Sequence, residues 1–155
     1  MEDPNYRVLM DYAMRALGQR AHTIFEMREK LKKRPHHTAE LEEIIISRLK
    51  ELKLLDDEAF IRRRIENAIN FSYEGQFKID QKLYTKGIPL EDTQLLWDSM
   101  KIDEFEVAKN ALKKISKRIS RAPKAQRFNK RAQFLASRGF SPSVVFELSR
   151  EPSKD

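Results

Sequence analysis

Two pairs of adjacent residues hold the side chains most able to do chemistry. His36 and His37 follow Pro35, and Asp56 and Asp57 precede a helical pattern. Adjacent histidines rarely chelate a metal alone, and no carboxylate or third histidine stands beside them at ligand spacing. One aspartate suits a helix N-cap and the other a charge in the first helical turn. We therefore expect no catalytic residue, no metal and no cofactor, and a protein that is not an enzyme.

The cations of the sequence are concentrated toward its C-terminal end. The net charge is +2 over residues 1–55, −2 over residues 56–102 and +7 over residues 103–155. No acidic residue occurs between Lys109 and Arg138. A solvated helix face is the simplest explanation, but such a face usually mixes both signs. We therefore predict an anion-binding role, toward DNA phosphate or an acidic groove on a protein. The candidate contact residues are Lys109, Lys113, Lys114, Lys117, Arg118, Arg121, Lys124, Arg127, Lys130, Arg131 and Arg138.

Two smaller basic clusters are weaker candidates for the same role. Arg62, Arg63 and Arg64 follow the Asp56–Asp57 pair, but successive residues on a helix point about 100° apart and cannot form one patch. Pairing of one or two of them with Glu58 or Glu66 explains them equally well. The second cluster is formed by Lys32, Lys33 and Arg34.

Composition favours an all-α fold. Of the 155 residues, 40% are hydrophobic and 35% are charged, and only four are glycine, fewer than a β-rich fold needs for its turns. No cysteine is present, so disulfides and thiol catalysis are excluded, and no glycine-rich phosphate loop occurs. The apolar runs are too short to span a membrane, and the N-terminus lacks an apolar signal core. The expected location is the cytoplasm.

Helical periodicity extends over almost the whole chain and predicts nine helices. We group them as three three-helix units, residues 5–55, 56–102 and 103–150, followed by a flexible tail at 151–155. In the third unit, the apolar stripe Phe105, Ala108, Leu112, Ile115 and Ile119 predicts one long helix. Lys109 to Arg121 would then share the opposite face of that helix.

A repeated motif supports the grouping. Residues 82–88 (KLYTKGI) resemble residues 134–140 (FLASRGF) at an offset of 52. In both, a glycine follows the expected helix end and can adopt the left-handed conformation there, so that the next apolar residue folds back onto the helix. Ile88 should therefore pack on Leu83, and Phe140 on Leu135. In the first unit, residues 32–35 (KKRP) replace this glycine turn.

These segments resemble the RecX family, regulators of the bacterial recombinase RecA. The strongest matches are residues 54–60 (LLDDEAF), 81–88 (QKLYTKGI) and 134–141 (FLASRGFS), and the resemblance extends from about Tyr12 to Leu148. It implies three tandem three-helix repeats in an elongated, curved array. It also implies binding to the RecA filament on DNA, usually inhibiting ATP hydrolysis and strand exchange, and so a place in recombination, DNA repair and the SOS response. The KKRP turn and residues 73–75 (YEG) depart from the expected loop pattern.

Two other functions are compatible with the sequence. One is a DNA-binding helical module without sequence preference, acting on single- or double-stranded DNA; the other is a helical scaffold for some other protein. We expect a monomer with no membrane association. Phe128 and Phe134 are expected in the core, so the sequence predicts no exposed aromatic platform for stacking bases.

Overall fold

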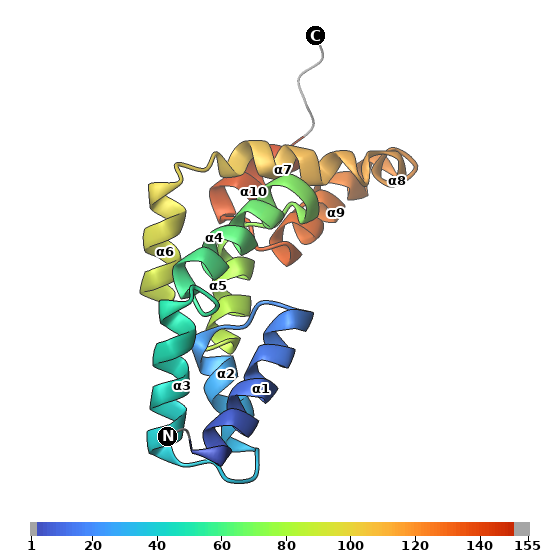
Figure 1. Cartoon of the computed structure of the whole chain (residues 1–155). Helices are drawn as coiled ribbons and strands as arrows, with labels where there is room; N and C mark the ends of the chain where they lie inside the picture. The colour runs from blue at the N-terminus through green and yellow to red at the C-terminus, as the bar shows by residue number, and fades with distance from the viewer. Residues whose placement is uncertain (1–2, 151–155) are drawn as a thin grey trace.

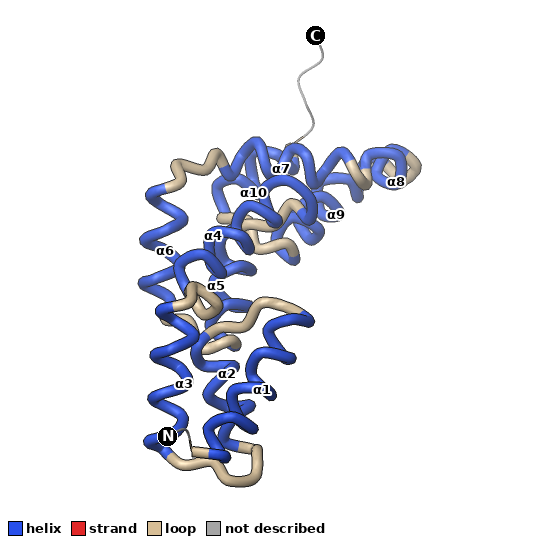
Figure 2. Tube along the Cα trace, in the orientation of Figure 1, coloured by secondary structure: helices blue, strands red, loops and turns tan. Residues whose placement is uncertain are grey.

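The computed structural model describes residues 3–150, and every regular element in that range is helical (Figures 1 and 2). The tail predicted to be flexible, residues 151–155, lies outside the described residues. The described part has ten α-helices and one π-helical segment, η1. The elements are α1 (Pro4–Gln19), α2 (Ile24–Lys32), α3 (Ala39–Glu51), α4 (Asp57–Asn67), η1 (Ala68–Ser72), α5 (Gln76–Thr85), α6 (Leu90–Ser99), α7 (Glu104–Lys113), α8 (Ser116–Ser120), α9 (Lys124–Ser137) and α10 (Pro142–Ser149).

Side-chain caps set the starts of several helices where the sequence predicts them. Thr23 and Glu26 form a capping box at α2, in which each side chain bonds the other residue's backbone N–H. The Thr38 hydroxyl caps α3. Asp56 caps α4, accepting from the backbone N–H of Ala59 at 3.1 Å. Asp56, the first residue of the aspartate pair, therefore has the predicted structural role of an N-cap.

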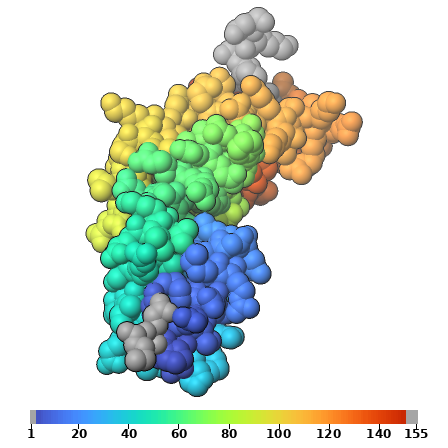
Figure 3. All heavy atoms as spheres, viewed as in Figure 1, coloured from blue at the N-terminus to red at the C-terminus, as the bar shows by residue number. Residues whose placement is uncertain are grey.

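The helices form three tandem repeats in an elongated, bent array (Figures 1 and 3). One cluster of buried residues, including Met27 and Ile45, lies among α1, α2 and α3. A second is centred on α4, α5 and α6, and a third on α7, α9 and α10. Ile69 and Ile102 pack against both the second and the third cluster. We keep the unit boundaries 5–55, 56–102 and 103–150 as a proposal.

The predicted glycine turns are confirmed. Gly87 and Gly139 have φ angles of 83° and 87°, which residues with a Cβ atom rarely adopt. The backbone N–H of Ile88 bonds Leu83 O at 3.1 Å, and that of Phe140 bonds Leu135 O at 3.3 Å. Both apolar residues are buried, as the repeated motif requires.

The single long helix predicted for the third repeat is wrong. Helix α7 ends at Lys113, and a separate short helix, α8, starts at Ser116. Backbone bonds of the tighter i→i+3 kind close the end of α7, and the Ser116 hydroxyl donates to Lys113 O at 3.1 Å. A serine hydroxyl that takes a helix carbonyl in this way competes with the regular ladder. The structure therefore has ten helices over residues 3–150 where nine were expected.

Successive repeats meet through helix ends. The end of α9 lies against the start of α5: Gly75 N–H donates to Arg138 O at 2.8 Å, and Phe77 N–H donates to Gly139 O at 3.2 Å. The end of α5 lies against the start of α2, where the Thr23 hydroxyl donates to Lys86 O at 2.7 Å. The middle helices of the three repeats are therefore joined end to start.

A carboxylate from the next repeat completes each of these junctions. Asp57 accepts from the backbone N–H of Ile24 at 3.0 Å, at the start of α2. Glu104 does the same for Gln76 at the start of α5, at 3.2 Å. The N-terminal N–H groups of a helix have no partner within the helix, so each carboxylate satisfies a donor in the preceding unit.

Replacing Asp57 tests this cap between repeats. Burial raises the pKa of Asp57, as do the nearby Asp56 and Asp92, although the bond from Ile24 opposes the shift. The fold therefore needs the acceptor oxygen at this position rather than its charge. We expect Asp57→Ala to lower the free energy of unfolding by about 1 kcal/mol and Asp57→Asn by less than half of that. Urea unfolding measures both, and equal losses would contradict the cap.

Candidate nucleic-acid interface

The eleven cations predicted to bind an anion are spread over α7, α8, α9 and the turns that join them. Because the helix is broken after Lys113, the cations from Lys109 to Arg121 do not share one helix face as predicted. Helix α8 instead projects from the end of the array beyond α7 (Figure 1). Five of the eleven make contacts within the protein, and the other six have no carboxylate partner among residues 3–150.

The five that are held have structural contacts. Lys109 pairs with Glu106 at 3.3 Å, and Lys114 donates to Phe71 O at 3.1 Å. Arg127 donates to Ala122 O at 3.0 Å and to Ser120 O at 3.1 Å. Arg131 donates to Ser149 O at 3.0 Å. Arg138 bonds the carbonyls of Ser72 and Tyr73, which ties α9 to the end of η1.

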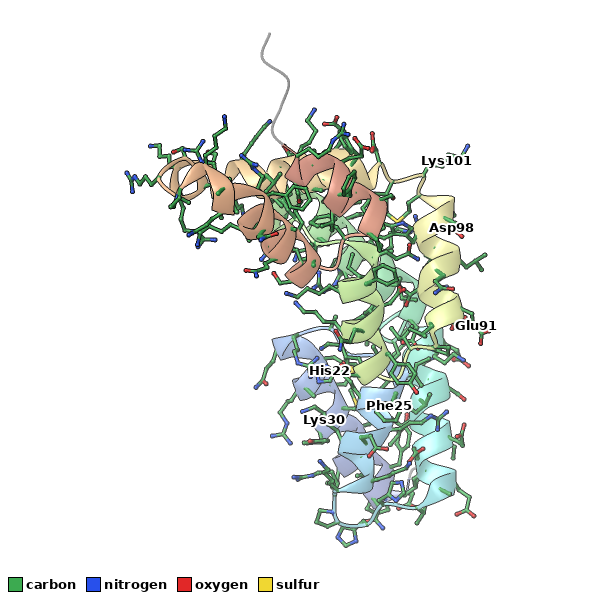
Figure 4. All side chains as sticks on the ribbon, turned by 180° about the vertical axis from the view of Figure 1, so that it is seen from behind. His22, Phe25, Lys30, Glu91, Asp98 and Lys101 are labelled. Carbon is green, nitrogen blue, oxygen red and sulfur yellow. The ribbon has the colours of Figure 1, made fainter. Side chains whose placement is uncertain are left out.

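The other six are side chains that point into solvent. None of them forms an ion pair with a carboxylate of residues 3–150, although Lys113 donates to the Asn110 amide oxygen at 3.5 Å. The acidic Glu91 and Asp98 lie on the outer side of α6, at the opposite side of the molecule from α8 (Figure 4). The six cations are therefore not neutralised within the described fold. They are Lys113, Lys117, Arg118, Arg121, Lys124 and Lys130.

Three of these cations line one pocket between α8 and α9. The pocket has a volume of about 730 Å³. Its cations are Arg118, Arg121 and Lys130, and it has no acidic residue among its walls. The side-chain amides of Gln126 and Gln133 add uncharged donors to the same surface. We call it the α8–α9 pocket; the remaining lining residues are Ala122, Pro123, Gln126, Gln133, Phe134 and Ser137.

The arginine run on α4 does not form a patch. Arg62 pairs with Glu58 at 3.5 Å, as the structural interpretation expected. Arg64 turns inward and pairs with Glu74, a partner that the sequence pattern did not indicate. Arg63 is exposed in a small pocket whose walls also include acidic residues.

The first-repeat cluster lies at the end of α2, far from α8 along the array (Figure 1). Lys32 pairs with Glu29 at 3.5 Å. The Arg34 guanidinium lies over the Tyr12 ring, 4.4 Å from its centre. Lys33 is exposed. The cluster therefore does not extend the cationic surface of the third repeat.

The sequence analysis missed a buried ionic cluster beside the junction of the second and third repeats. Glu74 is 3% exposed and accepts from Arg64 Nη2 at 2.5 Å and Lys82 Nζ at 2.9 Å. Burial alone would raise the pKa of Glu74, but the bonds from Arg64 and Lys82 lower it to about 2. The position of Arg64 on the apolar side of its helix was the available signal, because a cation there needs an acid.

The histidine pair has an ordinary structural environment. His37 Nε2 lies 2.8 Å from a carboxylate oxygen of Glu42, and His36 has a φ of 69° in the turn after α2. Over residues 3–150, no group of three histidine, aspartate or glutamate side chains is placed to hold a metal ion. Within the same range, no helix is both long and apolar enough to cross a membrane.

Three tandem helical repeats, the last of which carries a cationic pocket, define the chain as a helical-repeat protein. The model of the third three-helix domain of RecX matches residues 102–148. The chain is 28% identical to a Chlorobaculum tepidum protein named regulatory protein RecX, over 95% of this chain and 89% of that protein. The protein of the same name from Salmonella paratyphi A is 34% identical over 81% of this chain and 83% of its own length.

Solved structures agree with these relatives. A crystal structure of regulatory protein RecX superposes with a TM-score of 0.77 and 26% identity, covering 93% of this chain and 72% of that one. The RecX structure from Lactobacillus salivarius, at 23% identity and a TM-score of 0.76, has the same fold. The chain belongs to the RecX family of regulatory proteins.

Proposed function

We propose that this protein regulates the RecA recombinase by binding the RecA–DNA filament in the cytoplasm as a monomer, without catalysing a reaction. Its expected effect is to inhibit RecA's ATP hydrolysis and strand exchange. Membership of the RecX family supports a regulatory role connected with RecA, in recombination and DNA repair. The main evidence for the contact surface is the α8–α9 pocket, whose three cations have no carboxylate partner among residues 3–150.

The pocket suits phosphate better than it suits a specific base. Guanidinium and ammonium groups bind phosphate oxygens of any sequence, and such contacts position a protein without reading bases. Gln126 and Gln133 add donors and acceptors to the same walls. A regulator that acts on filaments of any sequence needs this kind of contact. A DNA-binding module that acts without RecA is the second candidate, and the same pocket supports it.

Charge reversal in the pocket tests the proposal. We expect the triple variant Arg118→Glu, Arg121→Glu and Lys130→Glu to bind single-stranded DNA at least about tenfold more weakly, with a salt dependence shallower by about 2 in log–log slope. The same variant should lose most of its effect on RecA's ATPase with single-stranded DNA. Fluorescence anisotropy over a salt series and a coupled ATPase assay measure the two quantities.

A second triple variant provides the matched control. Arg15→Glu, Lys50→Glu and Lys53→Glu change the net charge by the same amount at exposed positions of the first repeat. This control should keep most of its DNA affinity and its effect on RecA. Equal losses in the two triples would show that overall charge, and not the pocket, governs binding. DNA binding with no effect of the wild-type protein on RecA would favour the DNA-binding module.

A further inference from the structure

Helix α5 presents a row of exposed aromatic side chains that the sequence analysis did not predict. Phe77 and Tyr84 are 60% and 64% exposed, and the exposed Gln81 lies between them. The spacing i, i+4, i+7 places the three on one face of the helix. The opposite face packs in the core through Ile79 and Leu83, both fully buried. Core packing therefore does not explain the two rings.

The row extends across the junction with the first repeat. Phe25, at the start of α2, is 47% exposed. Its Cβ lies so near Gly87 that a side chain on the glycine would collide with it, which places Phe25 beside the last turn of α5. Figure 4 shows Phe25 at this junction. We call Phe25, Tyr84 and Phe77 the aromatic row.

The other end of the row lies where the start of α5 meets the end of α9, beside the α8–α9 pocket. Phe77 N–H bonds Gly139 O, and Lys78 Nζ lies 3.5 Å from the carbonyl oxygen of Ser137. Ser137 is a wall of the pocket. A ligand that leaves the pocket across Ser137 therefore reaches the start of α5, which carries Phe77, and Tyr84 lies about 10 Å further along that helix.

The chemistry of the surface changes along this path. The pocket is cationic, whereas Lys78 and Lys82, beside the row, already face the Glu74 carboxylate at 3.9 and 2.9 Å. The attraction for phosphate is therefore strongest in the pocket. Along the row, a ligand would contact mainly the flat rings and the Gln81 amide. A polymer with both an anionic group and a flat ring in each unit could place its anions in the pocket and its rings on the row.

We propose that the aromatic row stacks the bases of a single-stranded nucleic acid whose phosphates lie in the α8–α9 pocket. The inference rests on the proposed function, because it uses the same pocket for the backbone. Aromatic side chains stack on any base, so the row adds affinity without sequence preference. In a duplex the base faces are stacked on one another and cannot reach the rings. The protein should therefore prefer single strands to duplexes of the same sequence.

Removing two rings of the row tests the inference. We expect Phe77→Ala with Tyr84→Ala to weaken binding of a labelled oligothymidylate by at least about tenfold. Binding of a duplex of equal length should stay within twofold, and the salt slope should not change. The conservative pair Phe77→Tyr with Tyr84→Phe should restore wild-type affinity. The control is Phe71→Ala, which removes a ring that is 70% exposed on η1, outside the row.

The outcomes separate this inference from the proposed function. If both the pocket triple variant and the aromatic pair bind the single strand more weakly, and the aromatic pair binds the duplex as before, the proposed function and the inference are both supported. If the pocket triple variant weakens binding but the aromatic pair does not, the pocket's contact with DNA is supported and base stacking by the row is contradicted. If the aromatic pair keeps its DNA affinity but loses its effect on RecA, the row contacts protein and the inference is overturned. If the pocket triple variant binds as tightly as wild type, the proposed interface fails and the inference fails with it.

Discussion

Gly139→Ala should strongly destabilise the junction between the second and third repeats. A Cβ atom at Gly139 would lie 2.4 Å from the backbone nitrogen of Lys78, which cannot move without shifting α5. The φ of 87° adds strain for any residue with a side chain. We expect a loss of roughly 3 kcal/mol or more in the free energy of unfolding, measured by urea denaturation followed by circular dichroism.

Gly18→Ala is the matched control for this prediction. Gly18 lies in α1, and no atom is within 4 Å of the position that its Cβ would take. Alanine favours a helix over glycine, so this change should leave the stability unchanged or raise it by up to about 1 kcal/mol. A similar small effect at Gly139 would mean that α5 and α9 do not meet as closely as the structure shows.

Glu74→Gln should also destabilise the fold strongly. The variant keeps the shape of the side chain but removes the charge that faces Arg64 and Lys82. A buried cation that loses its partner is costly, and breaking such pairs typically destabilises by about 3–5 kcal/mol. Lys82 is half exposed and can turn to solvent, so we expect about 2–4 kcal/mol. Glu66→Gln, at an exposed position on α4, is the control and should change stability by less than about 0.5 kcal/mol.

The same carboxylate predicts how stability depends on pH. Its pKa is about 2 in the folded protein, below the ordinary value of 4.5, so folding favours its charged form. Its contribution, about 3 kcal/mol at most, is therefore complete above about pH 4.5 and is lost as the pH falls through about 2. Urea midpoints of wild type and Glu74→Gln should differ most at pH 7 and converge toward pH 2. A constant difference across this range would contradict the assignment.

The parts of the fold that depend on neighbouring residues in the chain were predictable. The turn at Gly87 follows from a leucine, a glycine and an isoleucine at fixed spacing, and the same chemistry recurs at Gly139. Capping boxes work in the same way, because the donor and the acceptor are three residues apart. Such motifs need no information about distant segments.

The break after Lys113 was not predictable in this way. Neither glycine nor proline marks it, and the apolar stripe continues through Ile115 and Ile119. The partner of Arg64 was missed for a related reason, since Glu74 reaches it only after the chain turns at Tyr73. Both depend on local turns of the backbone that the hydrophobic pattern does not mark.

The candidate site was predicted in part. The sequence showed where the cations are concentrated. It did not show which of them, such as Arg127 and Arg138, bond backbone carbonyls of the same chain. It placed Phe128 in the core, yet that ring is 38% exposed and packs edge-on against Phe146 at 6.0 Å. A helical wheel would have found Phe77, because Ile79 and Leu83 define the buried side of α5 and Phe77 lies on the other.

The unequal ways in which the three cores are joined should determine how the molecule flexes. Ile69 and Ile102 pack against both the second and the third core. Apolar contacts therefore join these two repeats. The first core shares no such residue with its neighbour among residues 3–150, and the bonds from Thr23 and Ile24 across that boundary are polar. Bending should therefore concentrate between α2 and α5. The cationic end would then behave as one stiff body, while the first repeat adjusts its angle to the contour of whatever surface it meets.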